Sequence, residues 1–110
     1  MDGLMLGRHQ IGSASCRIVE AMGVPEHMRE GLRELIDLTA SNPRKGHATA
    51  LMTKICAEAD RARITLLLTA KPFQDGMTDA QLRDWYARFG FQQIQDEPIL
   101  MARQVQIVRH

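Results

Sequence analysis

The segment that most constrains the fold is a helix-like stretch followed at once by a compact apolar strand. Residues 48–63 read ATALMTKICAEADRAR, and their apolar residues recur at the spacing of one helix face: Met52, Ile55, Cys56 and Ala59. Residues 64–70, ITLLLTA, predict a strand covered on both faces, because the apolar run is continuous. A strand reached through a helix is typical of a parallel crossover, so the sequence predicts a mixed fold, α/β or α+β.

A second helix is predicted after residue 78, with signals at both ends. Thr78 is a good N-cap, and Gln81 three residues later completes a capping box. Gly90 stands where a left-handed residue belongs after a helix. Residues 91–95 and 99–103 then predict two strands of a hairpin, joined by a turn at 96–98. The apolar face of this helix is formed by Leu82, Trp85, Tyr86 and Phe89.

The first forty residues give weaker signals. Residues 1–14 are spotted with Gly and Ser and are expected to be loose. Apolar residues within 15–22 have the spacing of one helix side, and the breakers that follow would end such a helix. Apolar positions between 28 and 39 fit a helical face, but LIDLTA, residues 35–40, also reads as a strand that leads into a turn at 41–43. Periodicity leaves both interpretations open.

Length, charge and cysteine content limit the classes of partner. The 110 residues argue for one domain spanning 1–110. The 14 Lys and Arg against 13 Asp and Glu give a net charge of +1, which disfavours nucleic acid as a partner. No signal peptide or apolar run long enough to cross a bilayer is found, so we expect a cytoplasmic protein with no membrane partner. Cys16 and Cys56 lack the spacing of a metal site, so no metal is expected and both should be reduced thiols.

Residues 41–49, SNPRKGHAT, form a candidate anion-binding turn before the first helix. A helix start presents unpaired N–H groups and the positive end of the helix dipole. Gly46 lets the backbone approach an anion, Ala48 keeps the first turn unobstructed, and Arg44 and Lys45 add charge. The alternative is a solvated basic turn, since the segment matches neither a Walker loop nor the dinucleotide glycine pattern.

Read with the segments that follow it, this turn resembles that of the GNAT superfamily of N-acetyltransferases, and the resemblance covers residues 35–103. That family has a Q/R-x-x-G-x-G/A turn for the acetyl-CoA pyrophosphate and a later Tyr-x-x-x-Gly-Phe pattern. Gly46 and Ala48 match part of the first pattern, and YARFGF, residues 86–91, matches the second fully. Pro43 departs from the Q/R position, and Asp79 stands where the family often has Asn. The part before residue 35 is also short for the family's first strand, two helices and long hairpin.

The resemblance implies a GNAT-like mixed central sheet flanked by helices, in a minimal version. Residues 35–40 would form a strand that splays away from the strand at 64–70, and the pantetheine arm of acetyl-CoA would lie in the gap. Tyr86 would be the general acid that protonates the coenzyme A thiolate, with a core aromatic as the alternative reading. His47 is expected to be an exposed turn residue that contributes its backbone N–H. The implied cofactor-binding residues are Leu38, Thr39, Ala40, Arg44, Lys45, Gly46, His47, Ala48 and Thr49.

The expected activity is transfer of an acetyl group from acetyl-CoA, the co-substrate, to an amine by direct attack in a ternary complex. Glu34 and Asp37 are candidate bases for the substrate ammonium, with solvated charges as the alternative. The acceptor amine stays open. A homodimer is expected, because the apolar residues within 105–108 would expose a sheet edge. The alternative function is a catalytically inactive acyl-CoA-binding or protein-interaction module.

Overall fold

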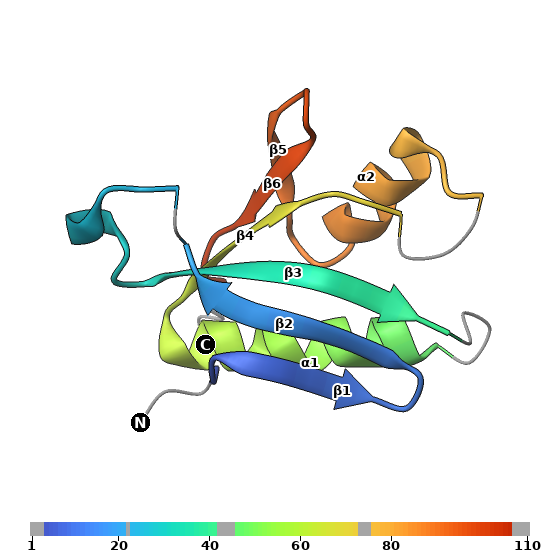
Figure 1. The fold of residues 1–110 in the computed structure, drawn as a ribbon, viewed down its shortest axis with the longest axis horizontal. Coiled ribbons are helices and arrows are strands. Elements are labelled where there is room, and N and C mark those ends of the chain that lie inside the picture. The colour runs from blue at the N-terminus through green and yellow to red at the C-terminus, as the bar shows by residue number, and fades with distance from the viewer. Residues whose placement is uncertain (1–3, 22, 42–45, 73–75, 107–110) are drawn as a thin grey trace.

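The structure is a computed structural model that describes residues 4–21, 23–41, 46–72 and 76–106. A six-stranded mixed sheet carries two α-helices, which confirms the predicted mixed α/β class (Figure 1). The order of strands across the sheet is β1-β2-β3-β4-β6-β5. The elements are β1 Gly7–Ile11, β2 Ala14–Glu20, the 3₁₀ helix η1 Glu26–Met28, β3 Leu32–Ala40, α1 His47–Ala62, β4 Thr65–Thr69, α2 Asp79–Ala87, β5 Gln92–Gln95 and β6 Leu100–Arg103. Within the described residues, neither helix has the length and apolarity needed to cross a membrane.

The N-terminal part of the chain forms an antiparallel hairpin of β1 and β2, so two sequence predictions are wrong. Residues 1–14 are not all loose, because Gly7–Ile11 pairs with β2 along its whole length. The helix predicted within 15–22 is not formed, because residues 15–20 belong to β2. The buried side chains of β2 are Ala14, Cys16 and Ile18, which alternate with less buried ones as in a half-buried strand. The helical spacing was misleading because Val19 belongs to the other face of the strand.

Most of the ambiguous segment, from Leu32 to Ala40, forms the strand β3, and the family resemblance implied a strand for 35–40. It begins at Leu32, three residues earlier than that implication, and pairs in parallel with β4 from Leu32–Thr65 to Leu35–Leu68. The connection between them is α1, so the predicted parallel crossover is confirmed. Four apolar residues of α1 lie on one buried face, as predicted: Met52, Ile55, Cys56 and Ala59.

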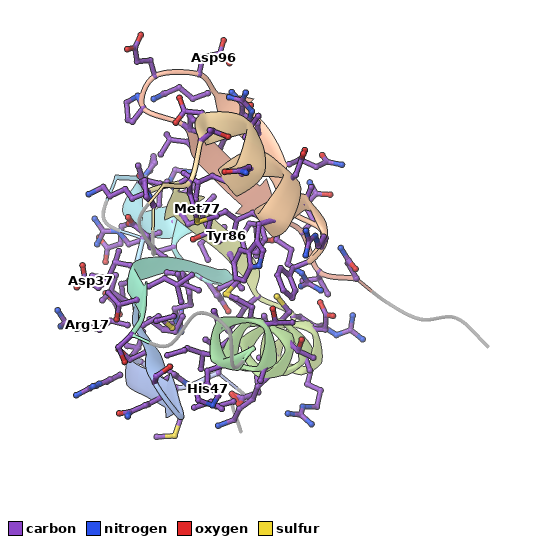
Figure 2. The ribbon with its side chains drawn as sticks, turned by 90° about the vertical axis from the view of Figure 1, so that its right-hand side faces the viewer. Arg17, Asp37, His47, Met77, Tyr86 and Asp96 are labelled. Atoms are coloured by element: carbon purple, nitrogen blue, oxygen red, sulfur yellow. The ribbon has the colours of Figure 1, made fainter. Side chains whose placement is uncertain are left out.

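Both α-helices lie on one side of the sheet. In Figure 2, α1 and α2 stand on the same side, and the labelled Arg17 and Asp37 stand on the other. The core fills the space between helices and sheet, where Leu66 and Leu68 of β4 are buried and Leu67 on the opposite face is half-buried. The prediction that β4 is covered on both faces is therefore wrong.

We call the helix-free side of the sheet the open face. Strand register assigns to it these residues, none of them fully buried: Arg8, Gln10, Ser15, Arg17, Val19, Glu34, Ile36, Leu67, Thr69, Leu100 and Ala102.

The predicted helix start at residue 78 and the hairpin after α2 are confirmed. The Gln81 N–H donates to Thr78 Oγ1 at 3.1 Å and the Thr78 N–H donates to Gln81 Oε1 at 2.9 Å, which completes the capping box. Gly90 has the positive φ of 95° expected after the helix. The hairpin strands are antiparallel, and β6 lies between β4 and β5.

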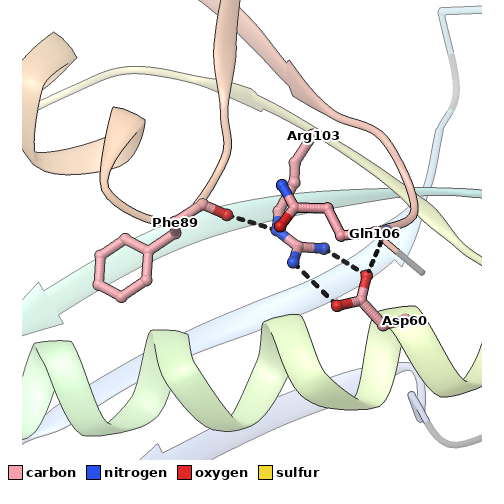
Figure 3. A network of polar contacts seen from close by, with 4 residues as sticks. All are labelled: Asp60, Phe89, Arg103 and Gln106. Carbon is pink, nitrogen blue, oxygen red and sulfur yellow. Dashed lines mark hydrogen bonds and ion pairs between the residues drawn. The ribbon is translucent and has the colours of Figure 1, made fainter. Parts of the chain in front are cut away.

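An ion pair between a buried arginine and a half-buried aspartate joins the end of α1 to the last strand (Figure 3). The Arg103 guanidinium, whose side chain is 5% exposed, donates to Asp60 Oδ1 at 2.8 Å and to Asp60 Oδ2 at 3.0 Å. Its Nε donates to the Phe89 carbonyl, and the Gln106 N–H donates to Asp60 Oδ1 at 2.9 Å. These contacts fix α1, the segment after α2 and β6 to one another.

Candidate functional site

The two central parallel strands, β3 and β4, separate halfway along β3. Their pairing ends at Leu35–Leu68, whereas β3 runs on to Ala40 with β2 as its partner. A bulge accompanies the separation, because Asp37 and Leu38 lie between the pairs Arg17–Ile36 and Ser15–Thr39. Asp37 has a positive φ of 56°, which is uncommon for a residue other than glycine. The strands therefore diverge at the place that the family resemblance implied.

A cavity of about 240 Å³ lies where the strands diverge, and we call it the inter-strand cavity. Its lining comes from β3, from the end of β4 and from α2: Glu34, Leu35, Ile36, Asp37, Leu38, Thr69, Lys71 and Tyr86. The sequence did not single out Thr69 as a site residue, because its position there depends on where the two strands separate. The cavity brings a phenol, a lysine, two carboxylates and a stretch of β3 together.

Tyr86 points from α2 toward β3 (Figure 2) and is 2% exposed. Its ring makes edge-on contacts with Trp85 and Phe91, at centroid distances of 5.0 and 5.7 Å. Burial raises the pKa of the phenol well above its usual value, and the neighbouring Cys16 raises it further. Tyr86 is therefore both a core aromatic and a cavity residue, and its hydroxyl stays protonated at neutral pH.

The N-terminus of α1 begins at Gly46, the N-cap, which adopts the left-handed conformation with φ 71°. Among the described residues, no side chain caps this helix end, and such N–H groups are suited to bind solvent or a ligand. A Cβ on Gly46 would meet no atom of the described residues within 4 Å. The predicted site residues Arg44 and Lys45 lie outside the described residues.

His47 is a half-buried structural link, which corrects the expectation of an exposed turn residue. Its Nδ1 accepts the backbone N–H of Ser13 at 2.9 Å and lies 2.8 Å from the Ser13 hydroxyl. The contact ties the β1–β2 turn to the start of α1. Sequence reasoning missed it because the two residues are 34 positions apart.

The remaining predicted cofactor residues do not gather in one place. Leu38 lines the inter-strand cavity with Tyr86. Thr39 and Ala40 instead line a more polar hollow of about 450 Å³ at the β1–β2 end of the sheet. Ala48 and Thr49 both belong to the first turn of α1, where Ala48 is buried and Thr49 is exposed. The site thus has two centres, a cavity at the strand separation and a helix start beyond it.

The two candidate bases differ in their surroundings. Asp37 is exposed, and its Oδ2 lies 4.0 Å from Nη1 of Arg17. The charges of the two side chains therefore partly balance each other. Glu34 is half-buried, and among the described residues no hydrogen bond or ion pair engages its carboxylate. Of the two carboxylates in this cavity, Glu34 is therefore the better placed to bind a positively charged ligand.

The two cysteines are free and buried. Burial raises the pKa of Cys16 to about 12 and that of Cys56 to about 11. Both therefore remain protonated at neutral pH and are unsuited to act as nucleophiles. In the described part of the chain, no group of three or more His, Cys, Asp or Glu side chains is placed to hold a metal ion.

Comparisons with known proteins support the fold but assign no function to the chain. No protein-family model matches the chain, and no curated protein is significantly similar to it in sequence. Among solved structures it is similar to the crystal structure of the anti-CRISPR protein AcrVA5, with a TM-score of 0.63 and 18% sequence identity. The match covers 88% of this chain and 98% of that one. At this identity, the likeness shows that the two proteins share a fold.

Proposed function

We propose that the protein is an acetyl-CoA-dependent N-acetyltransferase. The observation that carries the proposal is the inter-strand cavity, in which the diverging β3 and β4 meet the hydroxyl-bearing side chain of Tyr86. Support also comes from the match of residues 86–91 to the family's Tyr-x-x-x-Gly-Phe pattern.

Two features of the backbone suit acetyl-CoA. In the described part of the chain, no strand pairs with β3 beyond Leu35 on its β4 side, so the peptide groups there can pair with the amides of a pantetheine arm, as an added strand would. The uncapped start of α1 offers N–H groups to a diphosphate. A cofactor that spans both would place its thioester near Tyr86.

The chemistry that we propose is direct attack of a neutral amine on the thioester carbonyl. The C–N bond forms, the C–S bond breaks, and coenzyme A leaves as a thiolate that takes up the proton lost by the amine. Because burial raises the phenol pKa, complete transfer of the Tyr86 proton to a thiolate of pKa about 8.5 is uphill. Tyr86 is therefore assigned to stabilise the departing sulfur by donating a hydrogen bond.

The decisive experiment combines a binding and a turnover measurement. Coenzyme A should raise the melting temperature, because a ligand that binds only the folded state stabilises it. Acetyl-CoA with a panel of primary amines should release free thiol, and mass spectrometry should find the acetylated amine. Absence of both the thermal shift and thiol release would overturn the proposal.

The second candidate is a protein-interaction or acyl-CoA-binding module without turnover. The open face favours it, because a sheet face without helices is a broad surface for a partner. The structural likeness to an anti-CRISPR protein is compatible with it. Binding of coenzyme A without thiol release from any amine would select this candidate.

A homodimer in the cytoplasm remains part of the proposal. The part of the tail that is described, Val105 and Gln106, is not in a strand, and Ile107 and Val108 lie outside the described residues. Light scattering over a range of concentrations should give the dimer mass, and Ile107→Lys should shift it toward the monomer. A monomer at every concentration would contradict the expectation.

A further inference from the structure

A second cavity, of about 330 Å³, lies on the open face beside the inter-strand cavity. Its walls are the segment after β2 and the four strands β3, β4, β6 and β5. The residues that line it are Ala21, Gly23, Val24, Glu34, Leu67, Leu68, Ile94, Leu100 and Met101. Among these described residues, Glu34 alone carries a charge. We call this space the apolar cavity, and its volume is in the range of small-molecule sites.

Glu34 lines both cavities. On β3 it stands between Val19 of β2 and Leu67 of β4 in the strand register. The nearby Asp37 is balanced by Arg17, whereas no described residue pairs with the Glu34 carboxylate. A negative charge therefore stands at the junction between an apolar space and the proposed acetyl site, which suits a ligand with a cationic head and an apolar body.

We infer that the acceptor is a small primary amine with an apolar carbon chain. Its ammonium is held by Glu34 with the nitrogen toward the inter-strand cavity, and its carbon chain fills the apolar cavity. A polar amine such as a polyamine would lose hydration in this space without gaining hydrogen bonds, and that selects against it. The inference rests on the proposed function for the fate of the amine, but the binding site can be tested without it.

The test is calorimetric or NMR titration of the protein, without coenzyme A, with ethylamine, butylamine, hexylamine, 1,4-diaminobutane and hexanol. Each methylene that enters the cavity should tighten binding, by up to about fourfold. Hexylamine should bind at least tenfold more tightly than neutral hexanol and than 1,4-diaminobutane. Affinities that do not rise with chain length, or equal binding of hexanol, would overturn the inference.

Two variants and a control locate the site. Glu34→Gln should weaken hexylamine at least tenfold and leave hexanol nearly unchanged. Val24→Phe, in the segment that forms one wall, should shift the preference toward shorter amines by filling the space. Glu97→Gln removes an exposed carboxylate in the β5–β6 turn, lines neither cavity, and should leave every affinity unchanged. Hexylamine binding that is unaffected by both cavity variants would place the amine elsewhere.

The failures of the two proposals can be told apart. If hexylamine binds as expected but acetyl-CoA gives no thiol release with any amine, the proposed activity is wrong and the amine site stands. If thiol is released only with polar amines or with lysine peptides, the activity stands and the apolar amine is wrong.

Discussion

Tyr86 illustrates how one side chain can serve both packing and chemistry. Its ring is buried among Trp85 and Phe91, which explains why an amphipathic pattern alone predicts a core residue. The same side chain lines the inter-strand cavity, where a protonated hydroxyl can act. Burial fixes the protonation state, so the catalytic use that we propose depends on the packing.

The variant Tyr86→Phe keeps the ring and removes the hydroxyl. We expect turnover to fall about a hundredfold, as for loss of a positioned donor, with nearly normal affinity for coenzyme A. The free energy of unfolding should fall by about 1 kcal/mol, because a buried hydroxyl loses its interactions. Thiol release, coenzyme A titration and melting on one preparation give the three values.

Trp85→Phe is the control for packing, since Trp85 is half-buried next to Tyr86 but does not line the inter-strand cavity. It should lose stability with little loss of turnover. A Tyr86→Phe protein that turns over as fast as the wild type would refute the assigned role.

Gly46 offers a test of the anion site in which only charge is varied. Asp and Asn have the same size and both tolerate the left-handed conformation that this position requires. Gly46→Asp should abolish the rise in melting temperature caused by coenzyme A, because its charge opposes the phosphates. Gly46→Asn should keep most of that rise. An equal rise in both variants would mean that phosphates do not bind at this helix start.

Among the elements, the β1–β2 turn depends on the side chain that meets it from α1. Gly12 has φ 54°, and a Cβ built on it would lie 2.6 Å from the ring of His47. Gly12→Ala should destabilise the fold by about 2 to 3 kcal/mol, the sum of left-handed strain and a displaced ring. Denaturant unfolding measures the loss.

Gly46→Ala is the matched comparison, because Gly46 is also left-handed but a Cβ there would meet none of the described residues within 4 Å. This substitution should lower the free energy of unfolding by about 1 kcal/mol, because only the strain of the left-handed backbone contributes. Replacing His47 by Ala in the Gly12→Ala protein should relieve the clash. Equal losses for the two single alanine variants would show that the ring contact has no energetic weight.

Local patterns predicted the elements whose determinants are close in sequence. The capping box of Thr78 and Gln81 and the buried face of α1 are examples, since both are set within two turns of helix. The strand β2 was misread because only its pairing with β1 and β3 shows which side of Val19 faces the core. The His47–Ser13 link and the role of Thr69 likewise depend on tertiary pairing. The family resemblance predicted the strand separation, and the cavity residues named from the sequence are Glu34, Asp37, Leu38 and Tyr86.

At the scale of the whole molecule, the pair of Asp60 and Arg103 joins the part built on α1 to the part that contains β6. Burial by itself would raise the pKa of Asp60, but hydrogen bonds from Arg103 and the Gln106 N–H, with the charge of Arg103, lower it below its usual value. The carboxyl binds its proton more weakly in the folded state than in the unfolded one. Its contribution to stability is therefore complete above the unfolded pKa of about 3.9 and is lost as the pH falls through the folded value.

We accordingly expect Asp60→Asn to be less stable than the wild type by about 3 kcal/mol at pH 7, because a neutral amide no longer balances the charge of the buried Arg103 guanidinium. The difference should shrink as the pH falls below about 4. Urea unfolding of both proteins between pH 7 and pH 2.5 measures it, with Asp84→Asn on the exposed side of α2 as the control for net charge. A difference that is constant over this range would contradict the assignment.

The position of β6 between β4 and β5 has a consequence for how the protein is made. Among the described strands, β5 pairs with β6 alone, so residues 92–95 gain a place in the sheet only once residues 100–103 have joined β4. While the ribosome is still adding those residues, the edge of β4 lacks its neighbour, and β5 has no strand to pair with. A chain nicked in the turn between β5 and β6 should therefore yield two pieces that hold together by this strand, and the isolated larger piece should be captured by chaperones.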